Sequence, residues 1–150
     1  MAFDAAAPGW CYIPTMTRSN IELVEKLYEA FRRGALPFII GAFAVDAEIV
    51  QATELPWGGT YRRLAELQTF FAKLTQNITS TLLFERILDA GDRVVAIGRT
   101  RGTVVGNGRE FDLPIAHVWA VRSGKVAGFY PYIDNAGLLA ALSGPETAIR

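Results

Sequence analysis

The stretch that decides the fold is residues 93–133, RVVAIGRTRGTVVGNGREFDLPIAHVWAVRSGKVAGFYPYI. Apolar side chains recur at every second position through most of it, which is typical of strands with a buried face. Two short turns interrupt the pattern, Gly-Asn-Gly at 106–108 and Ser-Gly at 123–124, and both have hairpin chemistry. Long strands joined this tightly pair with their neighbours as an antiparallel meander. Strands are therefore predicted at 93–105, 109–122 and 125–133.

The residues on either side of this stretch extend the sheet and supply helices. A further strand is predicted at 79–89, joined to the meander by the Ala-Gly-Asp turn at 90–92. The TELPWGGTYR segment at 53–62 is predicted to be a loop because proline and glycine punctuate it. A capping box, Ser19 with Glu22, indicates the start of the first helix. The remaining predictions are helices at 19–34, 37–43, 64–74 and 135–142, and a strand at 48–52.

This order of elements predicts a single α+β domain, with a curved antiparallel sheet and three to four helices forming a cone, or cystatin-like α+β barrel. The helices cannot fill the sheet's whole inner face, so a hollow is expected at the wide end. The domain is predicted to span 19–143, with an N-terminal arm at 1–18 and a C-terminal tail at 144–150. The arm either is loose or packs on the body or on a partner chain through Trp10, Tyr12 and Ile13.

Composition excludes several classes of protein. The formal net charge is zero, whereas a nucleic-acid binder normally carries an excess of Lys and Arg. No apolar run approaches the length of a membrane span, so a soluble protein without a membrane partner is expected. Cys11 is the single cysteine and His117 the single histidine; neither has partners at metal-ligand spacing, and no metal is expected. One cysteine suggests a reducing, cytoplasmic setting.

Four stretches together resemble a known family. They are NIELVEKLYEAFRRGAL (20–36), ELPWGGTYR (54–62), HVWAVRSGKV (117–126) and YIDNAGLLAAL (132–142). In order and spacing the chain resembles the SnoaL-like polyketide cyclases within the nuclear-transport-factor-2-like superfamily, which includes ketosteroid isomerases, limonene epoxide hydrolases and scytalone dehydratase. The resemblance implies an α+β cone that dimerises through its sheet and holds a small apolar or aromatic ligand in a buried pocket without a cofactor.

The catalytic residues of two of these enzymes have no counterparts here. Where ketosteroid isomerases carry a tyrosine and two aspartates, the alignment places Leu27, Gln51 and Ala116. Epoxide hydrolases of this fold use an arginine between two aspartates; here Arg99 matches the arginine, but Arg101 and Pro131 stand in place of the acids. Without an acid to protonate the epoxide and a base to activate water, that mechanism is lost. Steroid isomerisation and epoxide hydrolysis are therefore disfavoured.

His117 has two interpretations, which depend on strand register. In the first, it faces the pocket and acts as a general acid or base, or as a hydrogen-bond donor to a ligand carbonyl. In the second, it is a packed imidazole on the sheet's other face. In the register of the isomerases, Ala116 and Val118 face the pocket and His117 faces away, which favours the second interpretation. A shift by one residue would reverse every assignment on the strand.

Asp134 and Glu54 are the other acid–base candidates. Asp134 lies at the pocket mouth, where a carboxylate could take a proton from a carbon next to a carbonyl; it is equally suited to cap the helix that follows, and the cap is the favoured interpretation. Glu54 and Trp57 either form a rim that gates the pocket, or Glu54 is solvated while Trp57 seals the edge of the core.

The other predicted ligand contacts are mainly aromatic. Tyr28 and Gln51 are candidates for polar groups inside the cavity, although Tyr28 is also typical of a core aromatic with its hydroxyl at the surface. The remaining predicted substrate-binding residues are Phe129 and Tyr132. Arg99 and Arg101 alternate on one side of a strand, and a solvated or dimer-facing stripe that pairs with Glu85 and Asp112 is the ordinary interpretation.

Three hypotheses about function follow. The first is a cofactor-free, homodimeric enzyme that performs isomerisation, aldol cyclisation or dehydration on a small apolar carbonyl compound, with Asp134 and His117 as acid–base residues and Glu54 behind them. The second is a module that binds a hydrophobic ligand without catalysis. The third is an association domain whose outward Trp119, Tyr130 and Tyr132 form the interface.

Overall fold

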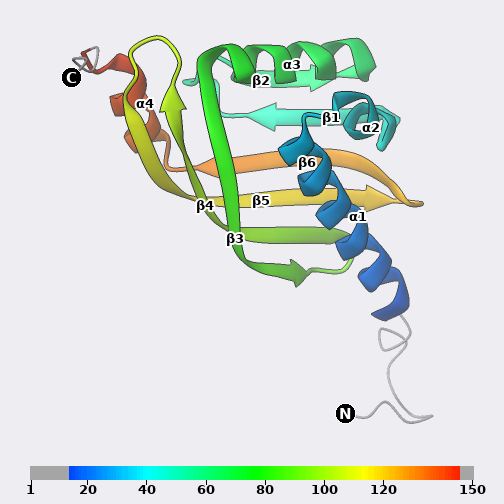
Figure 1. Ribbon diagram of the computed structural model, residues 1–150. Coiled ribbons are helices and arrows are strands. Elements are labelled where there is room, and N and C mark those ends of the chain that lie inside the picture. The colour runs from blue at the N-terminus through cyan, green and yellow to red at the C-terminus, as the bar shows by residue number, and fades with distance from the viewer. Residues whose placement is uncertain (1–13, 146–150) are drawn as a thin grey trace.

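The computed structural model describes residues 14–145, which form one α+β domain. A six-stranded curved sheet carries helices against one face, and α4 closes one end beside the hairpin that joins β4 and β5 (Figure 1). In chain order the elements are α1 (Pro14–Arg33), α2 (Leu36–Gly41), β1 (Phe43–Gln51), β2 (Gly59–Arg62), α3 (Arg63–Asn77), β3 (Ile78–Asp89), β4 (Arg93–Val104), β5 (Glu110–Arg122), β6 (Lys125–Ile133) and α4 (Asn135–Ser143).

The meander predicted from the turns is confirmed. Strands β3 to β6 pair in sequence order, each antiparallel to the next. Ser123 and Gly124 both have positive φ, 53° and 76°, as a two-residue turn between twisted strands requires. The hairpin turns thus fix these pairings locally.

The sheet is mixed rather than wholly antiparallel, which corrects one part of the prediction. The strand order is β2-β1-β6-β5-β4-β3, and β1 pairs with β6 in parallel. The TELPWGGTYR segment also contributes a strand: β2 pairs antiparallel with β1, Tyr61 opposite Ile49. The sheet therefore ends in two free edges, β2 and β3, and is not a closed barrel.

Helix α1 begins at Pro14, five residues before the capping box predicted at Ser19, so that box does not mark its start. The predicted stop is confirmed, because Gly34 has a φ of 71° and donates its N–H to the Phe31 carbonyl. None of the helices within residues 14–145 is long and apolar enough to cross a bilayer. Residues 1–13, including Trp10, Cys11, Tyr12 and Ile13, lie outside the described residues.

The core lies between the helices and the inner face of the sheet. Val24 and Leu27 of α1 and Leu67 and Phe70 of α3 are at most 2% exposed. Figure 1 shows α1 crossing the middle of the sheet while α3 runs along its β1–β2 side. Side chains of both helices line the candidate site on this face of the sheet.

Candidate functional site

A cavity of about 90 Å³ lies between α1, α3 and the inner face of the sheet. Most of its lining is aliphatic or aromatic, and no Asp, Glu, Lys or Arg side chain is part of it. The lining residues with polar side-chain groups are few: Tyr28, Gln51, Ser80, Thr100, His117 and the indoles Trp57 and Trp119. A hollow of this kind suits an uncharged, mainly apolar guest.

His117 lies on the inner face of β5, and this corrects the register used for the prediction. It is 8% exposed, pairs with Pro131 on β6 and Ala96 on β4, and lines the cavity. Ala116 and Val118, which were expected to face the pocket, are half-buried and lie on the opposite face. The bulky residues of β5 show the correct parity, because Ile115 and Trp119 share the face of His117.

A chain of hydrogen bonds holds the His117 ring. The indole Nε1–H of Trp119 donates to the Tyr28 hydroxyl at 2.7 Å, and that hydroxyl lies 2.9 Å from Nδ1 of His117. An indole nitrogen can only donate, so the tyrosine oxygen accepts from Trp119 and its own hydrogen is left for Nδ1. The opposite arrangement would leave the Tyr28 hydrogen without a partner at a buried site. The Tyr28 hydroxyl therefore points inward, as expected of a polar group inside the cavity, and the alternative of a hydroxyl at the surface is wrong.

Burial keeps both Tyr28 and His117 neutral. It lowers the pKa of His117 from 6.5 to about 3 and raises the pKa of Tyr28, an effect that the hydrogen bond from Trp119 only partly offsets. A neutral imidazole whose Nδ1 accepts a hydrogen bond carries its proton on Nε2. The Nε2–H makes no hydrogen bond to any residue of the described chain.

Gln51, the last residue of β1, is 5% exposed and lines the cavity as predicted. Its Nε2 donates to the Pro131 carbonyl at 3.2 Å. Because a carbonyl only accepts, the amide nitrogen must face Pro131 and the amide oxygen must face elsewhere. One strand, β6, lies between Gln51 on β1 and His117 on β5, and its Pro131 accepts from Gln51 and pairs with His117.

Aromatic rings form the walls around this polar row. Phe129 stacks on Trp119 with centroids 4.0 Å apart and meets the His117 ring edge-on at 5.1 Å. Trp57 is 2% exposed and lines the cavity, so it seals the edge of the core rather than forming a mobile rim. Trp119 is 4% exposed and lies inside, contrary to the hypothesis that it belongs to an outer interface.

Asp134, Glu54 and Tyr132 lie apart from the cavity lining. Asp134 is exposed and caps α4, accepting the Gly137 N–H at 3.0 Å, so the capping interpretation is confirmed. Glu54 is also exposed. Tyr132 is 60% exposed because it alternates with the inward Pro131 and Ile133 and so belongs to the other face. The structure therefore brings together His117, Tyr28, Gln51, Trp57 and Phe129 but not the three predicted residues at the rim.

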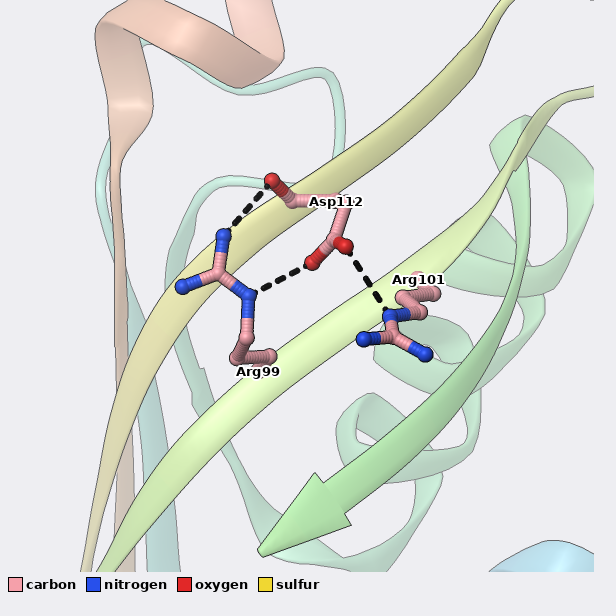
Figure 2. A network of polar contacts seen from close by, with 3 residues as sticks. All are labelled: Arg99, Arg101 and Asp112. Carbon is pink, nitrogen blue, oxygen red and sulfur yellow. Dashed lines mark hydrogen bonds and ion pairs between the residues drawn. The ribbon is translucent and has the colours of Figure 1, made fainter. Parts of the chain in front are cut away.

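The outer face of the same strands carries charge. Asp112 accepts from Arg99 Nε at 2.7 Å and from Arg101 Nε at 2.9 Å, and all three side chains are substantially exposed (Figure 2). These hydrogen bonds lower the pKa of Asp112. The predicted pairing with Asp112 is confirmed, whereas Glu85 makes no ion pair within residues 14–145. Arg99 therefore faces away from the cavity, and the inward neighbour is Thr100, 3% exposed.

No three His, Cys, Asp or Glu side chains come together in a way that could hold a metal ion in the part of the chain that the structure describes. The polar groups of the cavity are an imidazole, two hydroxyls, a phenol, an amide and two indole N–H groups. Their chemistry is hydrogen bonding to a neutral guest rather than metal coordination.

The comparisons with known proteins agree with this architecture. The family model of the SnoaL-like domain matches residues 24–129, so the chain belongs to the SnoaL-like domain family. A comparison with curated proteins gives no match.

Several solved structures have the same fold. An NTF2-like protein of unknown function from Burkholderia pseudomallei is 28% identical with a TM-score of 0.79, over 84% of this chain and 98% of that one. TerC, co-crystallised with polyporic acid, is 24% identical with a TM-score of 0.77, over 84% and 99%. A candidate polyketide cyclase from Pseudomonas putida is 21% identical with a TM-score of 0.67, over 81% and 96%.

Proposed function

We propose that this chain binds a small, neutral, mainly apolar molecule and that Nε2–H of His117 donates a hydrogen bond to a carbonyl oxygen of that molecule. The observation that carries the proposal is the Trp119–Tyr28–His117 chain, which leaves the Nε2–H of His117, a residue that lines the cavity, without a partner among the described residues. One net hydrogen bond to this donor would contribute about 0.5–1.5 kcal/mol. A ligand carbonyl would gain that free energy, whereas a hydrocarbon would not.

The absence of charge from the lining supports a neutral ligand. A carboxylate or ammonium group would lose its hydration without gaining a counter-ion in this cavity. Trp57 and Phe129 would contribute flat apolar surface, and Tyr28 would act through His117. TerC was solved with polyporic acid, which supports a role for this fold in holding small organic molecules.

Matched ligands provide the test. Butanone and the alkene in which C=CH₂ replaces its C=O differ in the acceptor and little in shape. We expect the wild-type protein to bind the ketone about three- to tenfold more tightly, the range of one net hydrogen bond, by ligand-observed NMR titration. His117→Phe should keep the apolar wall and abolish the preference. Failure of the wild-type protein to bind butanone, or an equal preference in the variant, would contradict the proposal.

A proton-transfer reaction is the second candidate. A hydrogen bond to a carbonyl stabilises the enolate formed when a neighbouring carbon loses a proton, which is the first step of isomerisation, aldol cyclisation or dehydration. His117 itself, with its pKa lowered to about 3, is the donor and not the base. The proton would pass to water, because no carboxylate lines the cavity. Faster deuterium exchange of bound butanone in wild type than in His117→Phe would support catalysis. Equal rates would mean that the protein binds the ketone without catalysing proton transfer.

We also propose that two copies associate through the outer face of the sheet. Its centre carries half-buried apolar side chains, namely Val95, Ile97, Ala116 and Val118. Sedimentation velocity should show a dimer that Val118→Asp dissociates, and a wild-type monomer at high concentration would contradict this. Neither a nucleic acid nor a membrane is part of the proposal, and the single cysteine is consistent with a cytoplasmic location.

A further inference from the structure

A second hollow, of about 370 Å³, adjoins the cavity. It lies where the end of α1, α2, the C-terminal half of α3 and the start of β3 meet, and we call it the outer cleft. Six residues line both hollows: Phe31, Ile39, Phe71, Leu74, Ile78 and Ser80. The cavity and the outer cleft are therefore neighbouring spaces with a shared wall of side chains.

The outer cleft has the same chemical character as the cavity. No charged side chain lines it, and Thr75, Thr79 and Ser80 are its hydroxyl-bearing members. Ser80 lies on the boundary of the two hollows, and Leu82, two residues further along β3, lines the cavity alone. The face of β3 that carries these side chains thus runs from the outer cleft into the cavity.

The size of the cavity limits what it can hold alone. An apolar cavity of about 150 Å³ accommodates benzene, and this one measures about 90 Å³. A ligand whose carbonyl reaches His117 and which is larger than a few carbon atoms must therefore extend beyond the cavity. The outer cleft is the adjoining space with matching, uncharged walls.

Resting on the proposed function, we infer that the ligand is a carbonyl compound with an apolar chain or second ring, and that the outer cleft binds this extension. The carbonyl end lies against His117, the chain passes Ser80, and the far end lies between α1 and α3. The site then selects elongated neutral ketones over compact ones.

A series of methyl alkyl ketones from butanone to decanone tests the inference. Each buried methylene contributes about 0.8 kcal/mol, so affinity should rise about two- to fourfold per added methylene once the cavity is full. Equal affinities along the series would overturn the inference while leaving the proposed function intact. If no ketone binds, the proposed function fails and the inference fails with it.

Two matched variants of α3 test whether the alkyl chain of the ketone lies in the outer cleft. Thr75 and Thr69 each donate their hydroxyl to a carbonyl four residues earlier and are exposed, but only Thr75 lines the outer cleft. Thr75→Trp should occupy the cleft and flatten the dependence of affinity on the length of the ketone. Thr69→Trp should keep the wild-type dependence. If both variants behave alike, the inference is overturned.

Discussion

The two faces of β4 and β5 differ in how they satisfy polar groups. On the outer face, Arg99, Arg101 and Asp112 pair with one another in contact with water (Figure 2). On the inner face of the same strands, Thr100 and His117 are buried in apolar surroundings. The charged groups on the outer face pair with one another and are in contact with water. The Nε2–H of His117 on the inner face has no acceptor among the described residues. The proposed binding site is therefore supported by this unpaired N–H group and not by the number of polar groups in the cavity.

The largest expected effect comes from moving an outer-face side chain inward. Thr100→Arg would place a guanidinium in a cavity whose lining has no carboxylate, and an uncompensated buried charge costs about 3–5 kcal/mol. Urea denaturation should show a loss of unfolding free energy of that size. The control, Arg99→Thr on the outer face, should change it by at most about 1 kcal/mol. Similar losses in both variants would break the comparison between the faces.

The second prediction concerns pH. The pKa of His117 is 6.5 in the unfolded chain and about 3 in the folded one, so the unfolded state binds the extra proton. Stability from this residue is complete above the unfolded pKa and falls as pH drops below it, by about 1.4 kcal/mol per pH unit until the folded pKa is reached. Urea midpoints between about pH 7 and pH 5 should show this slope in wild type and lose it in His117→Gln.

A transferred histidine provides the control for that slope. The double variant Ala116→His, His117→Gln carries its single imidazole on the other, half-buried face of β5. There the folded and unfolded pKa values should be similar, so stability should depend little on pH over this range. A slope equal to that of the wild-type protein would mean that the face of the strand does not matter.

The third prediction separates Asp134 from the cavity. Asp134→Ala removes the cap of α4 and should cost about 1 kcal/mol of unfolding free energy. Asp134→Ser, which can still cap, should recover most of it. Butanone affinity should not change in either variant, because Asp134 does not line the cavity. A large loss of affinity in Asp134→Ser would instead point to a direct role at the ligand.

The smallest effect is expected on the outer face. Arg101→Ala removes one of the two hydrogen bonds from arginine side chains to the Asp112 carboxylate, and exposed ion pairs contribute about 0.2–1 kcal/mol. The loss should shrink further when salt is added, because both side chains are exposed to screening. A salt-independent loss above that range would show that this face is less solvated than its exposure implies.

The features of the fold that could be predicted from the sequence are those that depend on residues close together along the chain. The hairpins followed from local turn chemistry, as at Ser123-Gly124, and the cap at Asp134 followed from its place before α4. The parallel pairing of β1 with β6 was not predictable, because it joins strands far apart in sequence. Strand β2 was missed because glycines at 58 and 59 indicated only a loop.

The site was predicted in part for the same reason. Gln51, Trp57 and Phe129 were correctly expected in the cavity. The face of the sheet on which His117 lies was not predicted correctly. Both faces of PIAHVWAV are apolar, so the alternation of side chains does not show which face is buried. Side-chain size was the unused signal: Ile115 and Trp119 share the face of His117, while the other face carries Ala116 and Val118. Which face is buried depends on α1, and Tyr28 reaches His117 from 89 residues away in sequence.

The most direct test of the central claim is the tautomer of His117. This is the single histidine of the chain, so a long-range ¹H–¹⁵N correlation spectrum reports one imidazole without mutation. A neutral ring protonated on Nε2, with Nδ1 as the acceptor and no titration between about pH 7 and pH 5, is the predicted result. A proton on Nδ1, or titration near the ordinary pKa of histidine, would mean that Tyr28 does not hold the ring and that no donor is held ready for a ligand.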